Sequence, residues 1–379
     1  MKKEIIVLGD VEMGGGTYTD DFISDKTLEK IILSLCNKKH PVDLVFNGDT
    51  LDFLKCPYIV NNRITYPRHI TSEISLAKLR LIYNAHTKVF KAMKKFVENS
   101  RNRIFFIIGN HDPDLAHKEV QDSIKSILQS SDNVFFTFHY TENGVHAEHG
   151  HQYDFINKVN TNHLFLRYKK KKILNIPWVS FGLISQFMDL KEEYPFMERI
   201  NPRPALFTQH KTAMKKINIR IFEAFFKGFF YYPVRYFYDP TYNFPKELVR
   251  EFYRRAKKVH WDVDDIIELF KRKNKKDLPN QKIYVLGHVH KRHIEDRNNV
   301  AIIHPDTWRD EYQLDMKTRQ LIPKEKRYLQ VLVSEDGSLD WDLVEVPIKR
   351  NIFHFDDVIR DERKYIKLAA QEEGHRLNF

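Results

Sequence analysis

Residues 103–112 of the chain read RIFFIIGNHD. The β-branched and aromatic run Ile104–Ile108 predicts a buried strand, and the polar tetrapeptide Gly109-Asn110-His111-Asp112 follows where that strand ends. Ordinary residue frequencies place a Gly-Asn-His-Asp tetrapeptide by chance in about one chain in a thousand of this length. Taken alone such a tetrapeptide is usually a turn, so its meaning depends on the rest of the sequence.

The same arrangement, an apolar run that ends in a polar cluster, occurs at four further places. The other predicted strands are Glu4–Leu8, Leu44–Phe46, Val134–Phe138 and Ile283–Leu286. The clusters that follow them are Gly9-Asp10-Val11-Glu12, Gly48-Asp49-Thr50-Leu51-Asp52, His149-Gly150-His151 and Gly287-His288-Val289-His290. Helical patterns over Leu28–Leu35 and Ile74–Val97 separate strands, so the order predicts an α/β layered fold with its active groups at the strand ends.

The residue types in these clusters indicate a metal site. Aspartate, asparagine and histidine supply the oxygen and nitrogen atoms that bind divalent metals in hydrolytic sites. A glycine beside each cluster lets the backbone turn tightly and approach the ligands. Each cluster alone is compatible with a turn or an isolated histidine, whereas all five in order favour a metal-dependent hydrolase.

Together these motifs resemble the calcineurin-like metallophosphoesterases, whose pattern is D-x-H, G-D-x-x-D, G-N-H-[DE], H and G-H-x-H. The resemblance covers roughly residues 4–154 and 281–310 and implies a four-layer α/β/β/α sandwich with a dinuclear metal centre. It also implies that Asp49 bridges two ions and that His111 acts as an acid or electrostatic stabiliser oriented by Asp52. The remaining implied ligands are Asp10 and His290 for the first ion, and Asn110, His149 and His288 for the second.

Elementary chemistry agrees with the resemblance. Two divalent ions roughly 3.5–4 Å apart can make a hydroxide from water and hold phosphate oxygens for in-line attack. An imidazole at the rim, such as His111, can protonate the leaving oxygen or neutralise charge on phosphorus. The expected reaction is hydrolysis of a phosphoester or pyrophosphate bond.

The sequence departs from the family pattern at Glu12, where the family usually has histidine. If Glu12 binds metal in place of the imidazole, the first site is rich in oxygen and favours Mn²⁺, with Fe, Zn and Mg as alternatives. If Glu12 points away, the first ion is weakly held or absent, and the chain is a non-catalytic scaffold. We also expect His151 to lie beside the ligands or face the substrate, and Arg309 to contact a phosphate or lie on the surface.

The net charge of +11 is distributed unevenly along the chain. Residues 155–280 contain 26 Lys and Arg against 13 Asp and Glu, so this third carries +13 and the rest of the chain −2. The same third holds 25 of the 50 aromatic residues. We therefore predict a first core part at 1–154, a basic and mainly helical insertion or cap at 155–280, a second core part at 281–350, and a helical tail at 351–379. The tail, with a helix expected over 356–370, shows no chemical motif.

Three roles are open for the insertion. Its aromatic residues can form a small core of their own, enter a membrane surface beside basic residues, or stack on nucleic acid, which is the less favoured partner. The related UDP-2,3-diacylglucosamine hydrolases carry a smaller helical insertion, an analogy of fold only. We expect a large anionic substrate, with a lipid-linked phosphoester as one hypothesis and a DNA or RNA nuclease as the alternative.

Composition restricts the location of the protein. No stretch approaches the roughly 18 consecutive apolar residues of a spanning helix, and Asp10 interrupts any signal-peptide core. Two cysteines, Cys36 and Cys56, are too few for a disulfide framework. The sequence therefore predicts a cytoplasmic protein, with peripheral contact at the inner membrane face as an accompanying hypothesis.

Overall fold

The structure is a computed structural model that describes residues 2–202, 209–243, 247, 250, 263–274, 281–297 and 299–377. Parts of the predicted insertion, namely residues 203–208, 244–246, 248–249, 251–262 and 275–280, lie outside the described residues.

Two β-sheets form the centre of the molecule. The first has the order β18-β17-β1-β2-β5-β6, and its strands span Leu339–Val346, Lys326–Val333, Lys3–Leu8, Val42–Phe46, Arg103–Ile107 and Val134–Thr137. The second has the order β13-β14-β12-β8-β7, over His293–Arg297, Val300–His304, Ile283–Leu286, Val145–Glu148 and His139–Glu142. Strands β1, β2, β5 and β6 are parallel to one another, as are β8, β12 and β14, so the carboxyl ends of parallel neighbours lie at one edge.

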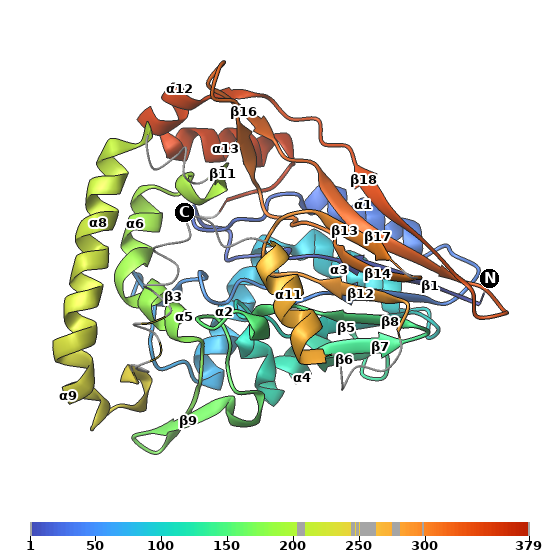
Figure 1. Ribbon diagram of the computed structural model, residues 1–379, viewed down its shortest axis with the longest axis horizontal. Helices are drawn as coiled ribbons and strands as arrows, with labels where there is room; N and C mark the ends of the chain where they lie inside the picture. Colours follow the sequence, from blue (N-terminus) through green and yellow to red (C-terminus); the bar gives the residue numbers. More distant parts are fainter. Residues whose placement is uncertain are drawn as a thin grey trace.

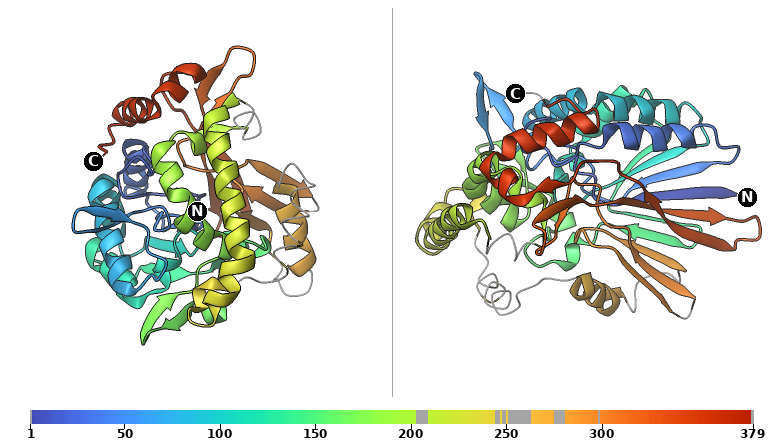
Figure 2. Two further views of the ribbon diagram at one scale, coloured as in Figure 1. Left: turned by 90° about the vertical axis from the view of Figure 1, so that its left-hand side faces the viewer. Right: turned by 90° about the horizontal axis from the view of Figure 1, so that it is seen from above.

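The sheets stack face to face and each carries helices on its outer face (Figure 1, Figure 2). Alternate residues of β1 divide between two cores, because successive side chains of a strand point to opposite faces. Ile5 and Val7 pack between the sheets, whereas Ile6 and Leu8 join the core beneath the helices. These helices are α1 (Asp25–Leu35), α2 (Ser72–Ala85), α3 (Thr87–Val97) and α4 (Lys118–Leu128).

The fourth layer is α11 (Val263–Asn274), which covers the second sheet. Its Ile266 and Phe270 pack with Leu286 and Ile302 of that sheet. The predicted four-layer α/β/β/α sandwich is therefore confirmed. Helix α11 lies within the range predicted for the insertion, yet it contacts the sandwich directly.

Two of the expected elements differ in the structure. The cluster at His149 does not follow Val134–Phe138 directly, because the hairpin β7–β8 intervenes and turns at Asn143-Gly144, both with positive φ. The helix expected over Ile74–Val97 breaks at His86, which leaves helical geometry at φ −112° and ψ 31°. The buried His86 ring bonds to other segments at this break.

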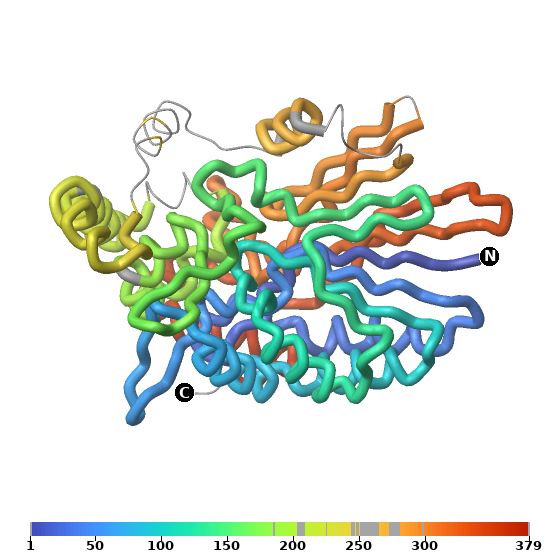
Figure 3. Tube along the Cα trace, turned by 90° about the horizontal axis from the view of Figure 1, so that it is seen from below, coloured from blue at the N-terminus to red at the C-terminus, as the bar shows by residue number. Residues whose placement is uncertain are grey.

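The described part of the range predicted for the insertion combines a hairpin with helices. The hairpin is β9 (Phe165–Tyr168) and β10 (Lys171–Leu174), followed by α5 (Trp178–Gly182), η4 (Leu183–Phe187) and α6 (Met188–Glu193). After residues outside the description come α8 (Lys211–Phe226), η6 (Lys227–Tyr231) and α9 (Tyr232–Tyr236). Helix α8 lies at the end of the molecule opposite the N-terminus (Figure 1, Figure 3).

A small sheet joins Ile200–Asn201, within the range predicted for the insertion, to strands near the end of the described chain. Its order is β11-β15-β16-β19, over Ile200–Asn201, Tyr312–Leu314, Gln320–Pro323 and Phe353–His354. Helices α12 (Phe355–Arg360) and α13 (Glu362–Glu372) pack on it, with Asp361 breaking the single helix expected there. The shorter elements are β3 (Tyr58–Val60), β4 (Arg63–Thr65), η1 (Pro113–Ala116), η2 (His151–Tyr153), η3 (Thr161–His163), η5 (Met197–Arg199) and η7 (Pro240–Tyr242).

Candidate functional site

The polar clusters predicted from the sequence converge at the carboxyl ends of the strands. Four of their non-glycine residues have left-handed backbone geometry, a conformation that costs roughly 1–3 kcal/mol per residue and gathers at functional sites. These residues are Glu12 (φ 56°), Asp49 (φ 48°), His288 (φ 80°) and His290 (φ 55°). The surrounding fold therefore forces these side chains into one place.

The first group of side chains surrounds His149. Its Nε2 lies 3.0 Å from Asp49 Oδ2 and 3.1 Å from Asn110 Oδ1, and its Nδ1 lies 3.0 Å from the carbonyl oxygen of Asn47. A carbonyl can only accept, so Nδ1 carries the proton there. Burial alone would lower the pKa of His149, but the negative charges of Asp49 and Asp10 raise it to about 10. This pocket therefore attracts positive charge.

His288 completes the group around Asp49. One ligand atom each from Asp49, His149 and His288 lie within 4.8 Å of one another. The backbone N–H of His288 donates to Asp10 Oδ1 at 3.1 Å, and its Nε2 lies 3.1 Å from Asp154 Oδ2. Asp154 thus orients the ring, as carboxylates commonly do for histidines that bind metals.

Two glycines make this close approach sterically feasible. A Cβ atom on Gly109 would lie 2.1 Å from Asp49 Oδ1, and one on Gly48 would lie 2.4 Å from the ring of His149. Any other residue at either position would displace a site side chain. The glycines in the predicted motifs are therefore needed for space as well as for turning.

A second group forms around Glu12 and His290. The Nε2 atom of His290 lies 3.4 Å from Asp10 Oδ1 and 3.4 Å from Glu12 Oε1. Glu12 Oε1 is buried and has no hydrogen-bond partner among the described residues. Such an atom is costly to bury unless something else satisfies it.

The other carboxylate oxygen of Glu12 is held by cations. Lys55 Nζ donates to Glu12 Oε2 at 2.6 Å, and Arg309 Nε lies 3.4 Å from the same oxygen. The two oxygens of Glu12 are thus differently placed: one faces lysine and arginine, and one faces the imidazole of His290 and the carboxylate of Asp10. An anion at this position, in place of a neutral imidazole, is balanced by the buried cations behind it.

His111 stands at the rim of the same site, with 17% of its side chain exposed. Its backbone N–H donates to Asp49 Oδ1 at 2.8 Å, and its Nδ1 lies 3.1 Å from Asp52 Oδ1. Burial opposes the charged form of the ring, but Glu12 and Asp52 raise the pKa of His111 to about 9. Because Nδ1 of the protonated ring faces Asp52, the other ring nitrogen, Nε2, is not occupied by that carboxylate.

His151 and Arg309 are both buried beside the proposed ligands. His151 is only 2% exposed, with its ring centroid 5.3 Å from that of His149, so of its two expected places it takes the one beside the ligands. Arg309 is 4% exposed and its Nη2 donates to Asp21 Oδ2 at 3.0 Å. It is therefore not a surface residue, and its guanidinium is engaged with Glu12 and Asp21.

The most important residue that the sequence did not indicate is Lys55. Its buried Nζ lies 2.6 Å from Glu12 Oε2, 2.6 Å from Asp21 Oδ2 and 3.0 Å from Asp52 Oδ2. It therefore links the group around Glu12 to the Asp52–His111 pair. The only available signal was a lysine three residues after Asp52, between apolar neighbours, and that signal is weak.

A four-layer α/β/β/α sandwich with carboxylate, amide and imidazole side chains at its strand ends defines a metal-dependent phosphoesterase. The family model described as calcineurin-like phosphoesterase matches residues 4–316, and the chain belongs to that family. It is accordingly a hydrolase of phosphoesters in a family that binds divalent metals, and the described residues include groups that could hold such ions.

Other comparisons add little. No curated protein matches the chain. A solved structure from Staphylococcus aureus, provisionally named a 5'-nucleotidase and determined in complex with alpha-ketoglutarate, is 13% identical with a TM-score of 0.32. The match covers 97% of this chain and 58% of that one, and a likeness this distant supports no argument about function. No helix among the described residues is long and apolar enough to cross a membrane.

Proposed function

We propose that the chain is a dinuclear phosphoesterase in which Glu12 replaces the usual histidine as a metal ligand. The observation that carries this is the buried Glu12 Oε1, which lacks a hydrogen-bond partner within the described part of the chain and faces the same space as Asp10 and His290. Asp10, Glu12, Asp49 and His290 would hold the first ion. Asp49, Asn110, His149 and His288 would hold the second.

The donor atoms fit a hard divalent ion. Three carboxylates and one imidazole at the first site favour Mn²⁺ over Zn²⁺, because hard ions prefer oxygen ligands. When bound, the two ions would supply Lewis acidity toward the phosphate oxygens and toward water.

The side chains of the chain supply the remaining chemistry. Asp52 accepts from His111 Nδ1, so the proton on His111 Nε2 would be available to the leaving oxygen or to charge on phosphorus. Lys55 holds the second oxygen of Asp52, at 3.0 Å, and thereby fixes the orientation of the pair.

A direct test compares wild type with Asp49→Asn on bis-p-nitrophenyl phosphate and p-nitrophenyl phosphate, each with added Mn²⁺, Mg²⁺ or Zn²⁺. We expect turnover that depends on Mn²⁺ and falls by orders of magnitude in the variant, while circular dichroism shows a retained fold. The preferred ester would distinguish diesterase from monoesterase. A fully active variant would refute the site assignment, and one or no Mn²⁺ per chain after loading would support the scaffold alternative.

We further propose that the substrate is large, anionic and lipid-linked, and that the insertion contacts a membrane. Apolar side chains recur every three or four residues along α8, η6 and α9, which places them on one helical face. Their exposed fractions are Ile219 50%, Phe222 73%, Phe226 58%, Phe230 66%, Val234 61% and Phe237 84%. Large contiguous apolar patches on a protein surface commonly mark a site of contact with a partner or a membrane.

Basic residues on the same helices favour an anionic lipid surface. Residues 211–236 include Lys211, Lys215, Lys216, Arg220, Lys227 and Arg235 against the single acidic residue Glu223. Each Lys or Arg near anionic lipid contributes about 1 kcal/mol, and anionic lipid is typical of the cytoplasmic leaflet. Few basic residues alternate with the aromatic ones, which makes a nucleic-acid groove the weaker alternative.

A cavity is lined by residues on both sides of α5 and at the end of α9. It has a volume of about 260 Å³ and is lined by residues that include Lys158, Trp178 and Tyr236. Lys158 adjoins Asn157, whose Nδ2 is 3.5 Å from His288 Nε2, and Tyr236 ends α9. A lipid-linked phosphoester could thus extend from the metal site toward the membrane.

Vesicle co-sedimentation tests the membrane proposal. With vesicles of phosphatidylcholine and phosphatidylglycerol at low salt we expect binding, reduced at high salt and with phosphatidylcholine alone. An absence of binding at low salt would contradict it. Turnover of single-stranded oligonucleotides in preference to phospholipid-type esters would favour the nuclease alternative.

A further inference from the structure

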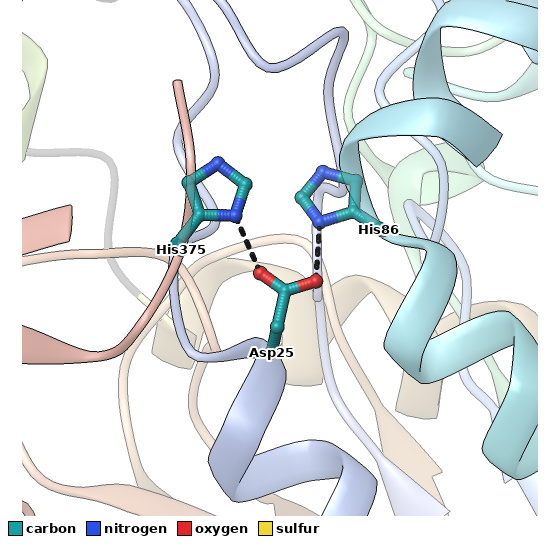
Figure 4. A group of neighbouring side chains, drawn as sticks. All are labelled: Asp25, His86 and His375. Carbon is teal, nitrogen blue, oxygen red and sulfur yellow. Dashed lines mark hydrogen bonds and ion pairs between the residues drawn. The ribbon is translucent and has the colours of Figure 1, made fainter. Parts of the chain in front are cut away.

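A second buried polar cluster lies outside the phosphoesterase site and joins three distant segments (Figure 4). Asp25 begins α1, His86 separates α2 from α3, and His375 follows α13. Asp25 Oδ1 lies 2.9 Å from His86 Nδ1, and Asp25 Oδ2 lies 2.6 Å from His375 Nδ1. All three residues are buried, with exposed fractions of 2%, 0% and 5%.

The cluster continues into the loop that follows Glu12. His86 Nε2 lies 3.1 Å from the carbonyl oxygen of Gly14 and 3.0 Å from Asp20 Oδ2. Because a carbonyl only accepts, His86 Nε2 is a donor. The Asp20 carboxylate in turn accepts from the backbone N–H groups of Gly14 at 3.0 Å and Gly16 at 2.7 Å. His86 and Asp20 therefore hold the backbone of the loop at Gly14 and Gly16.

Both ends of this loop reach the phosphoesterase site. Gly14 lies two residues after Glu12, and Asp21 directly follows Asp20. Asp21 binds Lys55 and Arg309, the two cations that face Glu12 Oε2. A shift of the loop would therefore move Glu12 and its cations together.

We infer that His375 is a positioning residue that acts through Asp25, His86 and Asp20 to hold the loop from Glu12 to Asp21 in its metal-binding arrangement. This inference rests on the proposed role of Glu12 as a ligand. It assigns a function to the segment after α13, which the sequence alone left without one. His375 touches neither the site nor the substrate, so its effect must appear in the loop and in the affinity of the first ion.

A pair of substitutions separates positioning from packing. In His375→Asn the side-chain amide can donate from nearly the position of Nδ1, whereas in His375→Leu the volume is similar and the donor is lost. His354→Leu is the matched control, because His354 also lies beyond residue 350 and 46% of its side chain is exposed.

Hydrogen–deuterium exchange on metal-free protein is the primary measurement. We expect faster exchange of the amides in residues 12–22 in His375→Leu, near wild-type exchange in His375→Asn and His354→Leu, and unchanged exchange in β1 and β2. Equal exchange of the loop in both His375 variants and wild type would overturn the inference. Because no metal is present, this result does not depend on whether the proposed function is correct.

Calorimetric titration with Mn²⁺ then tests the effect on the site. We expect His375→Leu to weaken one of two Mn²⁺ sites by roughly 10–100-fold, the range for partners that orient ligands, with His375→Asn near wild type. Wild-type affinity at both sites in His375→Leu would overturn the inference. A wild type with fewer than two sites would instead refute the dinuclear proposal. A metal ion that depends on both histidines, found by elemental analysis, would overturn the hydrogen-bonded arrangement.

Discussion

At the scale of single residues, Glu12 departs most from the family pattern. Its Oε2 atom faces Lys55 and Arg309, and its Oε1 atom faces the space beside Asp10 and His290. A glutamate at this position does not by itself mean a lost metal site, because the fold supplies the compensating charge.

Glu12→Gln tests that interpretation at nearly constant shape. We expect the affinity for one Mn²⁺ ion to fall by roughly tenfold or more, since an amide is a weaker ligand than a carboxylate. The measurement is calorimetric titration with Mn²⁺. Glu198→Gln is the control, because Glu198 bonds to Lys191 at 2.6 Å in the same charged network and has no place in the proposed ligand set. Unchanged affinity in Glu12→Gln would show that Glu12 does not bind metal.

Lys55→Met should destabilise the protein. It leaves Glu12, Asp21 and Asp52 without their shared cation, and breaking a buried ion pair from one side costs about 3–5 kcal/mol. Urea unfolding in EDTA measures this change. The control Lys118→Met alters a lysine with 82% of its side chain exposed and should shift stability by less than about 0.5 kcal/mol. Equal effects of the two substitutions would contradict the role given to Lys55.

The clusters around Asp10, Asp49 and Asn110 could be predicted because each is a short motif placed directly after an apolar strand. Lys55, Asp154 and His375 could not, because their partners are far away in the sequence. Asp25 and His375, for example, are separated by 350 positions. Burial also excludes the surface alternative for Arg309, since sequence position alone does not show that an arginine is enclosed by carboxylates.

At the scale of elements, the break between α2 and α3 has an electrostatic consequence. Burial would lower the pKa of His86, but the charges of Asp25 and Asp20 raise it to about 10. The ordinary value is 6.5, so the folded state binds this proton more tightly than the unfolded state. The resulting stability is fully present below pH 6.5 and is lost as the pH rises toward 10.

The free energies of unfolding of metal-free wild type and metal-free His86→Gln, each measured as a function of pH, should therefore converge as the pH rises. We expect the wild type to lose on the order of a few kcal/mol between pH 6.5 and 10, beyond any loss in the variant. The comparison is needed because His111 and His290 also have a pKa raised to about 9. Parallel curves over this range would show that the proton on His86 does not stabilise the fold.

The aromatic face of α8, η6 and α9 also belongs to this scale. Phe222→Ser with Phe230→Ser removes two of its most exposed rings, 73% and 66%, without opening a core. We expect vesicle binding to weaken at least tenfold, because each ring contributes a large apolar area at the headgroup boundary. Turnover of p-nitrophenyl esters should be unaffected. Phe181→Ser, which alters a buried insertion residue, should instead lower stability, and equal vesicle binding in wild type and the double variant would contradict the proposal.

Element boundaries were predicted well only where periodicity was strong. The strands β1, β2, β5 and β12 coincide with the predicted apolar runs to within two residues at each end. Strand β8 was missed because His146 and Glu148 interrupt its four residues. The helix break at His86 was missed because only its distant partner Asp25 explains why a histidine there leaves helical geometry.

At the scale of the whole molecule, the proposed ligands come from both halves of the sandwich. Metal removal should therefore destabilise the entire fold, since Asp10, Glu12 and Asp49 would repel one another without cations. Ligand binding at a hundred times the dissociation constant stabilises by about 2.7 kcal/mol per site. We expect Mn²⁺ to raise the melting temperature by several degrees over protein in EDTA, and Asp49→Asn to lose most of that gain. An identical melting temperature with and without Mn²⁺ would argue against resident metal.

The long sequence separation between β8 and β12, which pair in the second sheet, has a consequence for biosynthesis. Asp10, Asp49, Asn110 and His149 emerge from the ribosome early, whereas His288 and His290 follow about 140 residues later. At about 5–20 residues per second this interval lasts roughly seven to thirty seconds. A nascent chain thus carries an incomplete, strongly acidic pocket for that time, and a product cut short by premature termination before His288 would lack hydrolytic activity. Hydrolytic activity of this protein would therefore indicate that translation has proceeded beyond His288.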